Sequence, residues 1–136
     1  MRSHSWNIQE LPGLAPEFQQ KLAECGIETT GQLLQRSRTI SQRQSLARQL
    51  HLPLRYVNKW FALADLARIP SVGCQYNGLL LHAGIISVAQ LIEVPLGTLH
   101  ARLRRLQVAT LQRSDLCPDP GQIAVWLKEA RQLPAL

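Results

Sequence analysis

Two stretches of the sequence carry basic side chains without any acid, and these are the residues best suited to binding phosphates or carboxylates. One stretch runs from Thr29 to Ala64 and the other from Val94 to Ser114. Their basic residues are Arg36, Arg38, Arg43, Arg48, Arg55, Lys59, Arg102, Arg104, Arg105 and Arg113. With a net charge of +6, the chain suits a nucleic acid backbone or an acidic protein surface. We expect the two stretches to form one electropositive face, with an ordinary solvated exterior as the alternative.

Side chains that could perform catalysis or bind a metal are scattered along the chain. The histidines and cysteines show no spacing typical of a zinc site, a catalytic relay or a disulfide framework. They are His4, His51, His82, His100, Cys25, Cys74 and Cys117. No P-loop, dinucleotide fingerprint or nucleophile motif is present. We therefore expect no enzyme activity, no cofactor, no metal, and reduced thiols in the cytoplasm.

Helices with an aliphatic core must position the basic residues. Hydrophobic residues make up 46% of the 136 residues, whereas aromatic residues make up only 5%, so Leu, Ile, Val and Ala must fill the core. The first nine residues lack the apolar region of a signal peptide. No apolar run reaches the roughly 20 residues needed to cross a bilayer. The composition predicts an all-α, cytoplasmic protein without a membrane span.

Two segments of the chain match each other at a constant offset of 58 residues. The matching residues are Leu11, Pro12, Phe18, Leu22, Gly26, Ile27, Thr29 and Leu33 in the first copy and Ile69, Pro70, Tyr76, Leu80, Gly84, Ile85, Ser87 and Leu91 in the second. Apolar residues match apolar ones, aromatic residues match aromatic ones, and hydroxyls match hydroxyls. This pattern predicts a duplicated supersecondary unit.

Each copy predicts the same local structure, a tight turn followed by two helices. Gly26 and Gly84 fall where a left-handed residue would end the first helix. Thr29 and Ser87 fall where a side-chain cap would begin the second.

Tryptophans mark a further helix at the end of each copy. We expect helices from Tyr56 to Arg68 and from Gln122 to Gln132, with Trp60 and Trp126 in the core. The offset between these two tryptophans is 66 residues, so the second copy has gained eight residues upstream. Trp6 lies outside both copies and is expected to anchor a mobile segment or a partner.

The turn that opens each copy resembles the helix-hairpin-helix motif of DNA repair and replication proteins. In that family a Pro-Gly-aliphatic-Gly hairpin joins two helices, and its backbone N–H groups bind a DNA phosphate. The first copy has Ala15 in place of the second glycine, and the second copy has Ser71 in place of the first. The resemblance implies a phosphate site at Gly13, Leu14, Ala15, Ser71, Val72 and Gly73.

The charge around the two turns favours the alternative, a turn that only packs helices together. Four Glu and one Lys lie between Glu10 and Glu28. The stretch from Ile69 to Ile92 carries no formal charge if His82 is neutral. A backbone anion site normally has basic residues near it, and neither turn has them in sequence.

A further set of residues, spread from about Leu11 onward, forms a pattern of its own: Cys25, Gly26, Ile27, Arg43, Trp60, Ala64, Asp65, Leu66, Arg68, Ile69, Ala83, Gly84, Ile85, Leu99, His100, Ala101, Trp126, Ala130, Leu133 and Pro134. In these residues the chain is similar to an uncharacterised bacterial family, the domain of unknown function 4332. The resemblance implies a tandem helix-hairpin-helix architecture and lends no activity. Asp65 and Arg68 belong to a hallmark of that family, and we expect Asp65 to cap a helix or pair with an arginine.

These observations predict an all-α protein with two tandem helix-hairpin-helix-like units and a closing C-terminal helix. The expected parts are an extension over 1–10, a first unit over 11–68, and a second unit over 69–136 that shares its core with the first. The leading function is weakly sequence-dependent binding of nucleic acid backbone, without catalysis. It would use the two turns and the basic residues Arg36, Arg38, Arg43, Arg102, Arg104 and Arg105. The alternative is a protein–protein adaptor that docks to a larger complex through its basic face or hairpin loops.

Overall fold

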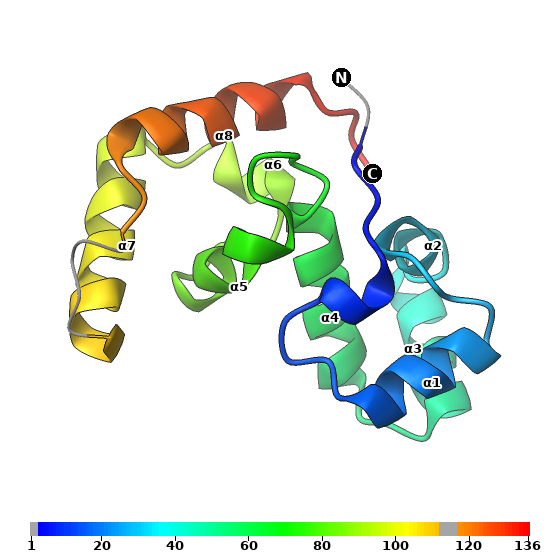
Figure 1. Ribbon diagram of the computed structural model, residues 1–136. Coiled ribbons are helices and arrows are strands. Elements are labelled where there is room, and N and C mark those ends of the chain that lie inside the picture. The colour runs from blue at the N-terminus through cyan, green and yellow to red at the C-terminus, as the bar shows by residue number, and fades with distance from the viewer. Residues whose placement is uncertain (1–2, 112–116) are drawn as a thin grey trace.

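The computed structural model describes residues 3–111 and 117–136, and every regular element in these ranges is a helix. The elements are η1 (Ile8–Glu10), α1 (Pro16–Glu24), α2 (Thr30–Gln35), α3 (Ile40–Leu50), α4 (Leu54–Leu66), α5 (Gly73–His82), α6 (Val88–Leu91), α7 (Leu96–Leu111) and α8 (Pro120–Gln132). The all-α prediction is confirmed. In Figure 1, α1 to α3 form one lobe and α5 to α8 the other, and α4 lies between them.

The element order of α1 to α4 recurs in α5 to α8. Helices α4 and α8 each have 13 residues, and both begin earlier than predicted. Helix α8 starts at Pro120, because proline fits the first helical position, where no N–H is needed, and Asp119 caps the helix. Helix α4 ends at Leu66, two residues before the predicted end at Arg68.

The same caps fix the local structure of both copies. Gly26 and Gly84 have φ angles of 82° and 91°, as expected for left-handed residues that end a helix. The Thr29 hydroxyl accepts from the Gln32 N–H at 3.1 Å, and the Ser87 hydroxyl accepts from the Gln90 N–H at 3.0 Å. The helix ends read from the sequence at these positions are therefore confirmed.

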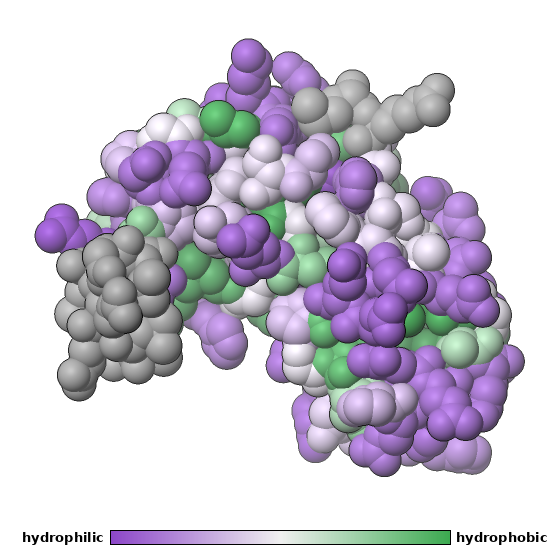
Figure 2. Space-filling model, in the orientation of Figure 1, coloured by the Kyte–Doolittle hydropathy of each residue, from purple (hydrophilic) through white to green (hydrophobic). Residues whose placement is uncertain are grey.

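Buried apolar side chains form two adjoining clusters, one in each unit. The first cluster runs from Ile8 to Ala64 and the second from Leu66 to Ala130. We expected one core common to both units. The buried side chains instead form two clusters that meet at the end of α4. Figure 2 shows hydrophobic side chains beside α1 and between α5, α7 and α8, among other places.

The predicted core tryptophans each lie in one cluster. Trp60 is 2% exposed and lies 5.7 Å, centroid to centroid, from the ring of Phe18. Trp126 is 1% exposed and lies 5.1 Å from the ring of Tyr76. Phe18 and Tyr76 are themselves repeat-related, so the same aromatic pair stabilises each unit.

The extra residues of the second copy lie in and after α7. This helix has 16 residues, against 11 in α3. Residues 112–116, which include Arg113, fall outside the described ranges.

The N-terminal segment binds the junction of the two units through Trp6. The indole Nε1–H of Trp6 donates to the Ala67 carbonyl at 2.7 Å, and the Thr30 N–H donates to the Trp6 carbonyl at 2.8 Å. The Trp6 ring covers Gly73 so closely that a Cβ there would lie 2.8 Å from Cζ2 of the ring. Trp6 therefore anchors its own segment to the protein.

Candidate partner-binding site

A buried ion pair stands where α4 ends and the second unit begins. Asp65 and Arg68 are 4% and 2% exposed, and an Asp65 carboxylate oxygen lies 2.7 Å from an Arg68 guanidinium nitrogen. The other Asp65 oxygen accepts from the Val88 N–H at 3.0 Å, at the start of α6. The predicted role of Asp65 as a helix cap and as a partner of arginine is confirmed.

Arg68 also joins segments near both ends of the chain. Its Nε–H donates to the Ser3 hydroxyl at 3.0 Å, and its NH2 group donates to the Pro134 carbonyl. Its own carbonyl accepts from the His4 N–H at 3.0 Å. The segment that begins at Ser3 and the segment that follows α8 accordingly lie close together in Figure 1. All these partners are internal, so Arg68 is a structural residue.

The second predicted phosphate site, at Ser71, Val72 and Gly73, has its N–H groups engaged inside the protein. The Ser71 N–H and hydroxyl donate to the two carboxylate oxygens of Glu129 on α8, at 2.9 and 2.7 Å. The Val72 and Gly73 N–H groups both donate to the Ile69 carbonyl. Val72 is 1% exposed, and Trp6 covers Gly73. A carboxylate of the chain thus occupies the position where this turn would accept an anion.

The first predicted phosphate site, at Gly13, Leu14 and Ala15, is more open. Gly13 is exposed with a φ of 75°, whereas Leu14 is 6% exposed within the first cluster. Ala15 offers α1 no side-chain cap. The Lys59 ammonium lies 3.7 Å from the place of a Cβ on Gly13, so one cation lies beside this turn.

The basic residues predicted to form one electropositive face lie in two places. Helix α7, with Arg102, Arg104 and Arg105, lies at the opposite end of the molecule from α2 and α3 in Figure 1. The two basic stretches thus place charge at opposite ends of the molecule, and one electropositive face that joins them stays a prediction. Arg102, Arg104 and Arg105 are exposed on α7.

The arginines of the first unit are partly committed to internal bonds. An Arg36 guanidinium N–H donates to the Cys25 carbonyl at 2.8 Å, at the end of α1. Arg43 donates to the Ser37 and Arg38 carbonyls at 2.8 and 3.2 Å, and its guanidinium lies 4.6 Å from the centre of the Phe61 ring. Arg38 itself is exposed. Arg36 thus ties the start of the α2–α3 connection to the end of α1, and Arg43 holds that connection in place.

An apolar groove of about 530 Å³ lies between the two units and is lined by residues 55–62 of α4. Its apolar lining includes Ile40 from α3, Phe61 from α4, and Leu81 and Ile86 from the second unit. Ile40 and Ile86 are 61% and 59% exposed. We call this groove, together with its basic lining residues Arg43, Arg55 and Lys59, the inter-unit groove.

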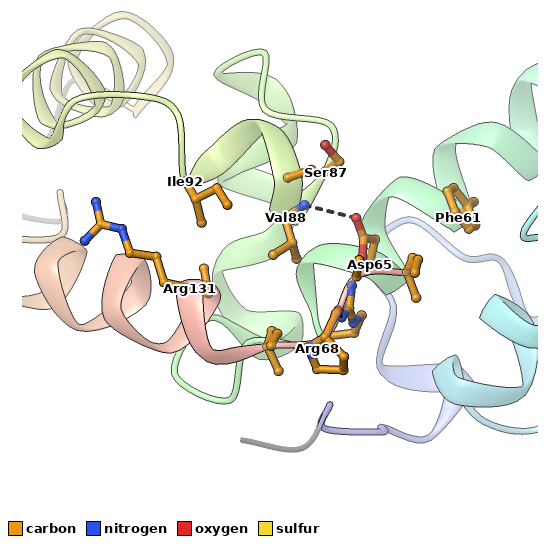
Figure 3. A pocket seen from close by; sticks show the side chains of 13 residues that line it. Phe61, Asp65, Arg68, Ser87, Val88, Ile92 and Arg131 are labelled. Carbon is orange, nitrogen blue, oxygen red and sulfur yellow. Dashed lines mark hydrogen bonds and ion pairs between the residues drawn. The ribbon is translucent and has the colours of Figure 1, made fainter.

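A second cavity of about 380 Å³ adjoins the inter-unit groove, because Phe61 and Ser87 line both. Figure 3 shows it from nearby, with Phe61 on one side, Ile92 on the other, and the bond from Val88 to Asp65 at its wall. Ile92 is 37% exposed. The two cavities together form a run of apolar surface across the junction of the units.

A comparison with family models matches residues 12–133 to the domain of unknown function DUF4332. The chain belongs to the DUF4332 family. No match was found among curated proteins or among solved structures.

The titratable side chains of this DUF4332 protein form no metal-binding group in the described ranges, and two of its thiols have raised pKa values. In residues 3–111 and 117–136, no group of three His, Cys, Asp or Glu side chains comes together to hold a metal. Burial, with a smaller contribution from the Glu10 carboxylate, raises the pKa of the Cys74 thiol to about 11. Burial also raises the pKa of Cys117, against the opposing effect of Arg104. Both thiols are thus poor nucleophiles at neutral pH. No helix of the described part is long and apolar enough to span a bilayer.

Sequence reasoning missed the inter-unit groove, although one signal for it exists. Ile86 stands where the first copy has Glu28, so an apolar residue replaces an acid at an exposed position of the repeat. Ile40 directly follows Thr39, whose hydroxyl caps α3, and such a residue is usually read as part of a helix start. Neither position shows from the sequence alone that it faces the other unit.

Proposed function

We propose that this DUF4332 protein is a non-catalytic adaptor that docks a partner protein in the inter-unit groove. In this proposal, 11–68 and 69–136 are two helix-hairpin-helix-like units, and their junction is the binding site. The observation that carries it is the gathering of exposed apolar side chains. Of the five large ones exposed in the described ranges, four line the two adjoining cavities: Ile40, Ile86, Ile92 and Leu136. Apolar surface concentrated in this way is typical of interaction sites, those for proteins among them.

The state of the turns favours a protein over a nucleic acid. The second turn already binds the Glu129 carboxylate, so its N–H groups are not offered to a phosphate. The first turn is open but lies in an acidic part of the sequence. A nucleic acid backbone also has no apolar side chain with which to cover Ile40 and Ile86. The three cysteines of the described structure are free thiols, which suits the reducing cytoplasm that we propose.

Nucleic acid backbone binding remains a second candidate because of α7. Arg102, Arg104 and Arg105 are exposed there, and no acid lies between Val94 and Ser114. Such binding must weaken as salt rises, with a slope of about −0.9 per phosphate contacted on double-stranded DNA. A titration of labelled DNA and RNA across salt tests this candidate, and the triple substitution of these arginines by glutamine should flatten the slope.

The adaptor proposal is tested with a pair of matched aspartate substitutions. We expect the immobilised chain to retain a defined protein from cell extract after nuclease treatment, and Ile86→Asp to abolish that retention. Val125→Asp is the control, because Val125 is 45% exposed on α8 and lines neither cavity. The retained protein is then purified and its affinity measured directly. Release by nuclease, or equal binding by the Ile86→Asp and Val125→Asp variants, would contradict the proposal.

A further inference from the structure

We infer that the occupant of the inter-unit groove is an acidic amphipathic helix of the partner protein. This inference rests on the proposed function and adds the chemistry of the partner. It follows from the arrangement of apolar and charged side chains along the groove.

The apolar surface has the form that a helix needs. Ile40 and Ile86 stand exposed at the two walls of the groove, and Phe61 lies in the lining shared with the second cavity. Beyond Phe61, Ile92 extends the apolar surface on the far side of that cavity, as Figure 3 shows. A helix docks in such a groove through apolar residues spaced by three or four positions on one face. Two adjoining cavities offer room for successive anchors of this kind.

The charged side chains that line the two cavities are all basic, apart from one acid that is already paired. Arg55 and Lys59 are exposed and lie one turn apart on α4, so both project along the same side of the groove. Arg131 lines the second cavity and is also exposed. The single acidic lining residue of the two cavities is Asp65, whose two oxygens are taken by Arg68 and by the Val88 N–H.

Charge complementarity therefore selects a partner helix with glutamate or aspartate beside its apolar face. A basic helix would bring like charges together at Arg55 and Lys59, which costs affinity and excludes wrong partners. Arg43 adds a cation whose position is fixed by its bonds to the Ser37 and Arg38 carbonyls and by the Phe61 ring. An acidic side chain would thus meet a guanidinium that loses little freedom on binding.

Two helical probe peptides of about 15 residues test the inference, since a chain of this length can present anchors over several turns. Both carry leucine at the anchor positions, and the flanking positions hold glutamate in one and lysine in the other. In fluorescence anisotropy, we expect the affinity of the full chain for the glutamate peptide to exceed its affinity for the lysine peptide by about tenfold or more. The affinity for the glutamate peptide should fall as salt rises. Ile86→Asp should remove the binding, whereas Val125→Asp should leave it unchanged.

A second pair of variants separates local charge from net charge. The Arg55→Glu, Lys59→Glu double variant should bind the glutamate peptide with an affinity that is lower by about tenfold or more. The Arg102→Glu, Arg104→Glu double variant changes the net charge equally, but on α7 at a distance, and should have little effect. Equal binding of both peptides, no binding of the glutamate peptide, or equal losses in the two double variants would overturn the inference. If Ile86→Asp still abolishes retention of a partner protein in any of these cases, the adaptor proposal is supported. Only the inference that the partner presents an acidic helix is then contradicted.

Discussion

The turns that open the two units occupy equivalent places in the repeat, yet they are used in different ways. In the first turn Gly13 is exposed, and Lys59 is its nearest neighbour from another part of the chain. In the second turn, Trp6 covers Gly73 and Glu129 accepts two hydrogen bonds from Ser71. The left-handed glycine has also moved by two positions, since Gly13 matches Ser71 and Ala15 matches Gly73.

This difference shows that two copies of a repeated unit can take different structural roles. The second turn and the end of α4 serve as the attachment point for the N-terminal segment and α8. In the first turn Gly13 is not covered in this way and stays at the surface. Three substitutions, each compared with a second variant, measure how far this division goes.

The largest effect is expected at Asp65. In the first unit, the backbone carbonyl of Trp6 accepts from Thr30 at the start of α2, whereas in the second unit the Asp65 side chain accepts from Val88 at the start of α6. Asp65→Ala leaves the buried Arg68 without its partner, so we expect the free energy of unfolding to fall by about 3–5 kcal/mol. Urea denaturation followed by circular dichroism measures it.

Asn7 provides the control, because it matches Asp65 in the repeat but is exposed and caps only η1. Asn7→Ala should cost about 1 kcal/mol or less. Equal losses from the two substitutions would show that the Asp65–Arg68 pair does not distinguish the units.

An intermediate effect is expected at Gly73. Alanine there must adopt a φ of 50° and would place its Cβ against the Trp6 ring, so we expect a loss of about 2–4 kcal/mol. Gly13→Ala meets only the flexible end of Lys59 and should cost about 1–2 kcal/mol from the backbone alone. In a Trp6→Ala background, the cost of Gly73→Ala should fall to that of Gly13→Ala. If it does not, contact with Trp6 is not what sets the second turn apart.

The features that the sequence predicted are those fixed by local rules. Gly26 and Gly84 end helices because only their own backbone conformation matters, and Thr29 and Ser87 begin helices by bonding three residues ahead. The Asp65 cap was foreseen in kind, although its partner Val88 lies 23 residues away.

The features that it did not predict depend on how distant segments meet. The bond between Ser71 and Glu129 spans 58 residues, and the indole bond of Trp6 spans 61. The inter-unit groove likewise brings together Ile40 of the first unit and Ile86 of the second. The separation of the two basic stretches could not be predicted for the same reason, because charge patterns along a chain do not reveal how two copies of a unit are oriented.

The smallest effect is expected at Glu129. Glu129→Gln keeps the shape of the side chain but removes the charge that receives the Ser71 N–H and hydroxyl. Because Ser71 is exposed, the loss should be about 0.5–1 kcal/mol. Ser71→Ala removes only the hydroxyl and should cost less, and the double variant should cost no more than the two single losses combined.

The Glu129→Gln variant also tests whether the second turn is closed to anions only because Glu129 covers it. If so, removing the carboxylate charge should make the Ser71 N–H respond to added inorganic phosphate, seen as a shift of its amide resonance that the unaltered chain lacks. If the resonance stays unmoved, the turn is closed by its own geometry. Trp6 over Gly73 and the two bonds to the Ile69 carbonyl would then be sufficient to keep anions away.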